Sequence, residues 1–228
     1  MLEGTQRRKR TQSGNALIEF TIAYAFMIPL VLGLAAFGLG MIKYLQVASL
    51  ARTAGGMFVR GADFTQSGYQ KILGKVSGDL GFADSNYNIL TTSAGKGVVT
   101  LTVLMRVGTN QCSGIISPYV CNNQNKVVVI KQVILGNHSL TGQSVFGNPT
   151  TGQQTDGSFD SNIYLSNSSF VVPAFGTAPN DTSATPGVTL DLRAGETAYA
   201  AEAFFVAPEW NLFPRIYNQP GYYHRIYF

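Results

Sequence analysis

An uninterrupted apolar run between Glu19 and Lys43 constrains the fold of this 228-residue chain more than any other feature. The run holds 23 residues without a charge. As an α-helix it spans roughly 35 Å, and the hydrocarbon core of a bilayer is about 30 Å thick. We therefore predict a single-pass transmembrane helix, and we place this helix and its extension at residues 15–60.

A basic leader, residues 1–14, precedes this helix. Its four adjacent cations are Arg7, Arg8, Lys9 and Arg10. Because positive charges beside a membrane helix stay on the cytoplasmic side, we expect a cytoplasmic N-terminus and an exported remainder. A cleaved secretory signal peptide is the first competing interpretation, but its apolar core is normally only about 7 to 15 residues long. The longer run favours an uncleaved anchor.

The distribution of charge argues against nucleic acid as a partner. The formal net charge is +4, but the leader carries +3 of it, so the residues after Gly14 carry only +1. No basic patch remains there to neutralise phosphates. Charged residues make up only 12% of the chain, which suits an exported protein better than a cytosolic enzyme.

Two cysteines, Cys112 and Cys121, lie between two strand-like segments. Two thiolates without a neighbouring histidine cannot complete a tetrahedral metal site, so we expect no metal there. Outside the cytoplasm the pair would form a disulfide that closes a short loop. Two unpaired thiols are the alternative if the segment is cytosolic.

The entrance of the apolar run reads Gly14-Asn-Ala-Leu-Ile-Glu19-Phe20. This G-x-x-x-x-E-F pattern, between a basic leader and an apolar helix, resembles a type IV prepilin processing site. The resemblance implies that a membrane aspartic peptidase cuts after Gly14 and leaves Asn15 as the new N-terminus. It also implies that Glu19, fifth in the mature chain, pairs with the N-terminal amine of a neighbouring subunit.

The wider stretch G-N-A-L-I-E-F-T-I-A-Y-A-F-M-I-P-L is similar to the TadE-like family of pseudopilins, over about residues 10–60. Members of this family are minor components of tight-adherence (Flp) pilus systems. The resemblance therefore implies other pilin-like subunits, the assembly machinery and a prepilin peptidase as partners, in the bacterial inner membrane. The exported head of this chain would then lie in the periplasm or on the pilus. The family often carries an acidic residue at the outer end of the helix, where this chain has Gly38-Leu-Gly-Met-Ile-Lys43. The alternative to this pseudopilin function is an unprocessed, membrane-anchored extracytoplasmic binding domain.

In the exported part, residues 61–228, the pattern over 63–80 is typical of an amphipathic helix. Asp63 is a candidate N-cap and Gly81 a candidate stop. The expected buried stripe consists of Tyr69, Ile72, Leu73, Val76 and Leu80.

Strand patterns follow this helix. Residues 97–108 alternate between apolar and polar positions, and residues 126–135 are apolar on both faces, as in a central strand. We expect these two strands to form a hairpin with the cysteines near its tip. Further candidate strands are 188–192, 197–206 and, more weakly, 87–90. The aromatic segment 222–228 is either a last strand or a subunit contact.

Together these elements predict an α+β head, in which an antiparallel sheet packs on helix 63–80. Residues 136–187 contain no Lys or Arg and are rich in Gly, Asn, Ser and Thr. We interpret them as a long loop insertion, which aromatic side chains tie to the head: Phe146, Phe159, Tyr164 and Phe170.

Motifs of catalysis or cofactor binding are weak in this sequence. Ser93-Ala-Gly-Lys96 matches S-x-x-K without its companion motifs, and the loop from Asp156 lacks the glycine and glutamate of a calcium site. We therefore expect no enzyme activity, no cofactor and no metal. The competing hypothesis, a membrane-tethered hydrolase, requires that some pair converge in a pocket from among Asp156, Asp160, His138 and Glu202.

Overall fold

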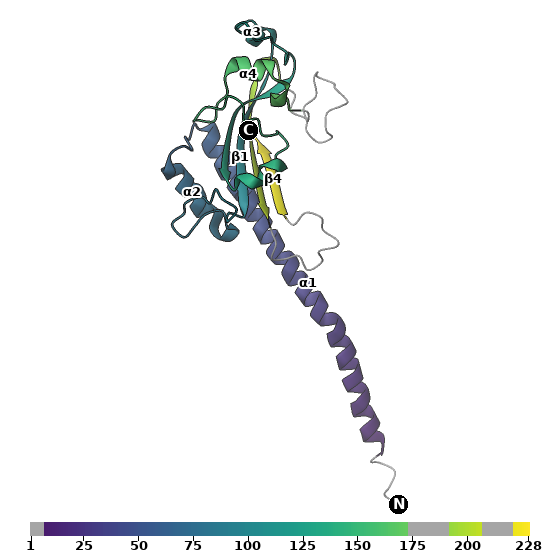
Figure 1. Cartoon of the computed structure of the whole chain (residues 1–228). Helices are drawn as coiled ribbons and strands as arrows, with labels where there is room; N and C mark the ends of the chain where they lie inside the picture. Colours follow the sequence, from purple (N-terminus) through teal and green to yellow (C-terminus); the bar gives the residue numbers. More distant parts are fainter. Residues whose placement is uncertain (1–6, 173–191, 207–220) are drawn as a thin grey trace, which may run out of the picture. The chain divides into compact units, whose positions relative to one another are not determined.

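The structure, a computed structural model, describes residues 7–172, 192–206 and 221–228, without side chains at 7–15 and 142–143. The chain divides into two compact units, Met1–Ile42 and Lys43–Phe228. The antiparallel sheet and the short helices all belong to the second unit (Figure 1).

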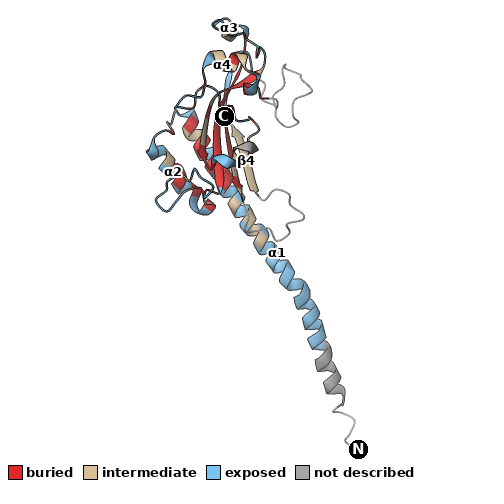
Figure 2. Cartoon of the chain, in the orientation of Figure 1, coloured by how far each residue is buried: buried red, intermediate tan, exposed pale blue. Residues whose placement is uncertain are grey.

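Helix α1 spans Arg7–Val59 and is the longest element of the chain. Its segment 16–42 exposes its large apolar side chains to the surroundings, Phe20, Phe26 and Phe37 among them. The run is visible as exposed helix in Figure 2. In length and composition α1 is sufficient to span a membrane, as the sequence predicts.

The sheet has four antiparallel strands in the order β2-β1-β3-β4. Their bounds are β1 Gly97–Arg106, β2 Val127–Gly136, β3 Thr197–Val206 and β4 Gly221–Tyr227. The predicted α+β class, the β1–β2 hairpin and a final strand at the aromatic C-terminal segment are confirmed.

Short helices surround the sheet. They are α2 Ser67–Ser77, η1 Gly78–Leu80, α3 Thr109–Cys112, η2 His138–Gln143, α4 Ser161–Ser166 and η3 Ser168–Phe170. Gly81, the predicted stop, follows η1 in the left-handed conformation, with φ 71°. This is a backbone state that glycine adopts without a steric penalty.

The last turns of α1, and not helix 63–80, provide the main cover of one sheet face, which corrects the predicted packing. Buried α1 side chains, which contact β1 and β3, are Val47, Leu50, Ala51, Ala54 and Phe58. They pack in one core with strand residues that include Leu101, Ala201 and Ala203. Small side chains on both surfaces allow helix and sheet to approach closely.

The predicted stripe on helix 63–80 is largely wrong. Leu73 and Leu80 are buried, but Tyr69, Ile72 and Val76 remain exposed by 37–46%. The helix begins after Gln66, and Asp63 instead accepts hydrogen bonds from the backbone N–H and the hydroxyl of Thr65. Because the last turns of α1 already cover this face of the sheet, α2 lies beside α1 and buries only a narrow strip of its own surface, around Leu73.

Strand β2 is an edge strand, contrary to its predicted central position. Its outer edge is covered by the chain's own later residues: Gly157 O accepts from Gln132 N–H, and Phe159 N–H donates to Ile130 O. Further along, Val172 N–H donates to Val127 O. The strand is apolar on both faces because this segment and α1 bury it on both sides.

Residues 136–172 of the predicted loop insertion therefore help to build the fold. Together with the ends of β1 and β2 they form a second core, which contains Phe146, Phe159, Leu165, Phe170 and Val172. Phe159 and Phe170 meet edge to face, with ring centroids 4.9 Å apart. Tyr164 packs against this core from a partly buried position. The remainder of the predicted insertion, 173–187, lies outside the described residues.

The three remaining strand predictions have different outcomes, of which 197–206 is confirmed as β3. Residues 87–90 form no strand: Ile89 makes an isolated bridge with Ala83, and Tyr87 has a positive φ of 62°. The candidate strand 188–192 falls almost entirely outside the described residues, and Leu192 is buried without being in a strand.

Gly55 allows a test of the close helix–sheet contact. A Cβ atom at Gly55 would lie 2.9 Å from Ala201 Cβ and would also collide with the ring of Phe228, whereas at Gly56 it would meet nothing within 4 Å. We expect Gly55→Ala to lower the free energy of unfolding by about 1–3 kcal/mol through overpacking. Gly56→Ala, the matched control, should be neutral or should stabilise the helix by up to about 1 kcal/mol. Denaturant titration of both variants in detergent measures this difference, and equal stabilities would contradict the contact.

Candidate functional site

The predicted processing signal lies in the first turns of α1. Gly14, Asn15 and the cations Arg7, Arg8, Lys9 and Arg10 have helical backbone, and their side chains lie outside the described part. Glu19 and Phe20 are exposed, and the Phe20 ring lies 4.6 Å from that of Tyr24. Among the described side chains none donates a hydrogen bond to Glu19. Its carboxylate is therefore accessible to a cation from another molecule.

Cys112 and Cys121 form a disulfide, as predicted, with their Cα atoms 5.5 Å apart. The bond closes the connection between the end of β1 and the start of β2. The closed loop exposes Ile116, Tyr119 and Val120.

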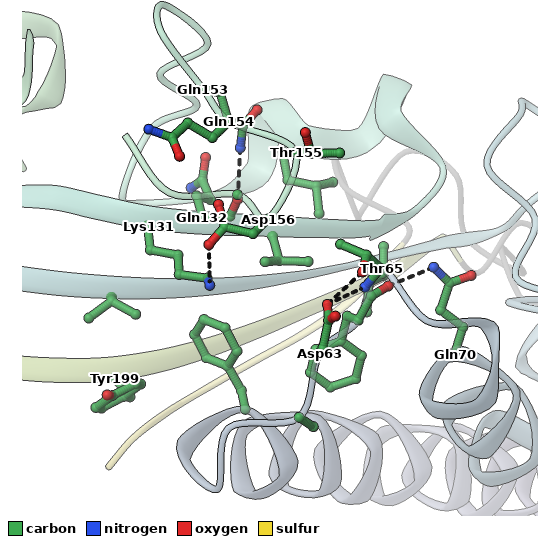
Figure 3. Close-up of a pocket in the computed structure, with 18 of the residues that line it drawn as sticks. Asp63, Thr65, Gln70, Lys131, Gln132, Gln153, Gln154, Thr155, Asp156 and Tyr199 are labelled. Atoms are coloured by element: carbon green, nitrogen blue, oxygen red, sulfur yellow. Dashed lines mark hydrogen bonds and ion pairs between the residues drawn. The ribbon is translucent and has the colours of Figure 1, made fainter. Parts of the chain in front are cut away.

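A polar groove of about 800 Å³ opens on the head, at the outer edge of β2. Figure 3 shows Asp63, Thr65 and Gln70 on one side, Gln153 to Asp156 on the other and Lys131 between them. Phe58, Phe64 and Tyr199 contribute aromatic surface to its lining. The residues come from five separate stretches of the chain: the end of α1 with α2, β1, β2 with the residues just after it, the insertion and β3.

The charged side chains of the groove are two carboxylates and one lysine, and each has a partner within the head. Lys131 Nζ lies 3.1 Å from Asp156 Oδ2, and Ser158 also donates to this carboxylate. The Ser158 hydroxyl and backbone N–H, followed by Lys131, lower the pKa of Asp156 to about 2. Hydrogen bonds from Thr65 likewise lower the pKa of Asp63. Both carboxyl groups are thus ionised at neutral pH.

A second polar cluster lies beneath the opposite face of the sheet, around the buried Glu202. The hydroxyls of Ser144 and Tyr223 donate to its two oxygens, and the N–H of Val145 donates at 3.2 Å. Burial raises the pKa of Glu202, and these three hydrogen bonds oppose that shift. The carboxyl group joins β3 to β4 and to the insertion, so its role here is to hold the fold together.

The side chains required by the hydrolase hypothesis are only partly brought together. Asp156 and His138 both line the groove, without a hydrogen bond between them in the described structure. Glu202 lies in the separate cluster, and Asp160 caps the N-terminus of α4 by accepting from Asn162 N–H. Because Ser158 and Lys131 lower the pKa of Asp156 to about 2, its carboxylate is a weak base near neutral pH and is poorly suited to general-base catalysis.

Most residues of the groove could not be predicted from the sequence. Gln70, Gln153 and Tyr199 carry no motif, and only the fold brings them to one place. For Glu202 a sequence signal does exist, because it is the single charge inside the run Ala200-Ala-Glu-Ala203 of a buried strand. A buried carboxylate in such a strand demands polar partners.

Comparisons of this chain with protein-family models, with curated proteins and with solved structures gave no match.

The Glu202 cluster generates a prediction about pH. The folded-state pKa lies above the ordinary value of 4.5, so between these two values the folded state binds more protons than the unfolded state. The stability contributed by this carboxyl is therefore present below pH 4.5 and is lost as the pH rises through the folded-state pKa. An amide does not ionise, so Glu202→Gln should lose less stability than the wild type as the pH rises from 4.5 to neutral.

The measurement is the denaturant midpoint of the full chain in detergent at several pH values. Glu196→Gln, which alters an exposed carboxylate, is the matched control and should follow the wild-type pH curve. Parallel curves for Glu202→Gln and the wild type would contradict a raised pKa at Glu202.

Proposed function

We propose that this chain is a membrane-anchored pseudopilin or minor pilin that takes part in assembly of a tight-adherence (Flp-type) pilus, after processing by a prepilin peptidase. One observation carries the proposal: the sequence from Gly14 to Phe20 stands between a basic leader and a helix long enough to span a membrane. A Gly-x-x-x-x-Glu-Phe pattern alone is weak. Its position at the entrance of the only such helix among the described residues gives it weight.

Physical chemistry supports the role of Glu19 in this proposal. An ionised carboxylate near the hydrocarbon costs on the order of 2–3 kcal/mol unless a cation meets it. Cleavage after Gly14 would create a positive amine at Asn15. On an adjacent subunit this amine would neutralise the exposed carboxylate of Glu19, so that helices dock side by side in a defined register.

The proposed location is the bacterial inner membrane, with a cytoplasmic N-terminus and a head in the periplasm or on the pilus. The basic leader supports this orientation. The Cys112–Cys121 disulfide supports it independently, because such bonds persist outside the reducing cytoplasm.

The proposed role of the head is structural rather than catalytic. Its ionised Asp156 is paired with Lys131, and its buried Glu202 is hydrogen-bonded into the fold. No group of three or more His, Cys, Asp or Glu residues that could hold a metal ion occurs in the described part of the chain.

An unprocessed, membrane-anchored extracytoplasmic binding domain is the second candidate function. The groove at the β2 edge favours it, because a cavity of this size is typical of ligand sites. The two functions differ at the N-terminus, since only the pilin-like function requires cleavage.

The first test is the N-terminal residue and intact mass of the protein recovered from membranes of a host with an active prepilin peptidase. We expect a chain that begins at Asn15, and Gly14→Val should block cleavage. Gly33→Val, which places a side chain in open space on the same helix, should be cleaved normally. A wild-type chain that still begins at Met1 would contradict the pilin-like function and would favour the unprocessed, membrane-anchored domain.

The second test separates cleavage from docking. Glu19→Gln should be cleaved but should no longer recover pilin-like partners after crosslinking in membranes, because the new amine then has no carboxylate to meet. Glu3→Gln is the matched control, since Glu3 belongs to the leader that cleavage removes. Equal recovery of partners by the two variants would contradict the docking role of Glu19.

A further inference from the structure

The groove at the outer edge of β2 has a lining that defines one class of ligand. It lies wholly within the unit Lys43–Phe228, so its chemistry is independent of the proposed processing at the N-terminus. Its volume of about 800 Å³ falls in the usual range for sites that hold small molecules. Figure 3 shows the side chains that surround it.

The charge of the groove disfavours an ionic ligand. The single lysine, Lys131, is bound to Asp156, and the second carboxylate, Asp63, is hydrogen-bonded by Thr65. A phosphate or carboxylate would meet two negative charges and one neutralised cation. The same lysine would repel a cation that approached Asp156. A neutral ligand fits this balance best.

Three glutamines line the rim, and in each of them one polar atom of the side-chain amide is hydrogen-bonded within the head while the other is open to a ligand. Gln70 Nε2 donates to Phe64 O, and Gln153 Nε2 donates to Gln132 O, both at 2.7 Å. Gln154 Oε1 accepts from the hydroxyl of Ser158 at 3.3 Å. The free ends are thus two carbonyl oxygens and one NH₂ group, a mixed set of acceptors and donors on partly immobilised side chains.

The other part of the lining is aromatic. Phe58 and Tyr199 meet edge to face with ring centroids 5.8 Å apart, and Phe64 lies 6.4 Å from Phe58. Tyr199 is only half-buried, so part of its surface remains open to a ligand. A ring face carries partial negative charge and attracts the polarised C–H groups of a flat saturated ring.

The backbone of β2 adds one donor and one acceptor. Gln132 directs its N–H outward to Gly157 O, and antiparallel periodicity directs the N–H and C=O of Ile134 the same way. Neither group of Ile134 has a hydrogen-bond partner among the described residues, and Ile134 lines the groove. Gly136, with φ 100°, ends the strand, so a peptide could pair at only one position. One position is too short for strand addition, and a small polar ligand is favoured over a peptide.

We propose that this groove binds a short neutral saccharide of two or three rings. Hydroxyl groups both donate and accept, so they match the open ends of the three glutamines and the outward groups of Ile134. The C–H face of a sugar ring covers the exposed part of Tyr199. The paired charges contribute hydrogen bonds without requiring an ionic partner.

Saturation-transfer NMR on the full chain tests this proposal. The protein is placed in lipid nanodiscs prepared without sugar-headed detergent, which would compete for the site. The probes are maltotriose, cellotriose and triacetylchitotriose, with trialanine as a short-peptide control. We expect saturation transfer from at least one trisaccharide, at millimolar affinity or tighter, and none from trialanine.

Variants then assign the signal to the groove. The double variant Gln70→Ala/Gln153→Ala should weaken binding about tenfold or more, because it removes two hydrogen bonds from the site. Gln124→Ala alters an exposed glutamine between Cys121 and β2, outside the groove lining, and should bind as the wild type does. Circular dichroism melts confirm that each variant is folded, and if the double variant is not, Gln154→Ala replaces it.

The proposal is overturned by any of three results. The first is that none of the three trisaccharides shows saturation transfer. The second is that trialanine shows as much transfer as the trisaccharides. The third is that a folded groove variant binds with unchanged affinity. The N-terminal processing assay reads a separate part of the chain, so failure of this proposal leaves the proposed function to be judged by its own test.

Discussion

The head depends on one close contact, in which the small side chains of α1 lie against the alanines of β3. Ala51, Ala54 and Gly55 on the helix face Ala201 and Ala203 on the strand, and larger residues fill the space at either end. Buried apolar surface is the main source of stability in a domain of this size. Here a large part of one sheet face is covered by the last turns of the same helix that contains the exposed apolar segment 16–42. Folding of the head therefore requires the part of α1 from Val47 to Phe58.

The parts of the fold that local pattern determines were predicted well. The long apolar helix, which is sufficient to span a membrane, follows from an apolar run. The β1–β2 hairpin with its disulfide follows from two strand patterns with cysteines between them. Each needs only neighbouring residues, so one sequence suffices to find it.

Packing over long separations was predicted poorly. Helix α1 is apolar around its whole circumference over much of its length, so no stripe marks the face that meets the sheet. A visible stripe on 63–80 suggested the wrong helix. Likewise, β2 is apolar on both faces because residues 157–172 cover its edge, an arrangement that its own sequence cannot distinguish from a central position. The groove is assembled from residues as distant as Asp63 and Tyr199, which share no motif.

The strand order has a consequence for the time course of folding. Strands β1 and β3 are adjacent in the sheet, but Gly97 pairs with Phe205, about 100 residues later in the chain. Closing so long a loop is slow compared with forming a local hairpin. The β1–β2 hairpin is therefore expected to form before β3 arrives. Until then the alanine face of α1 remains uncovered, so the folding chain passes through a state in which this apolar surface is open to a chaperone or to a second chain.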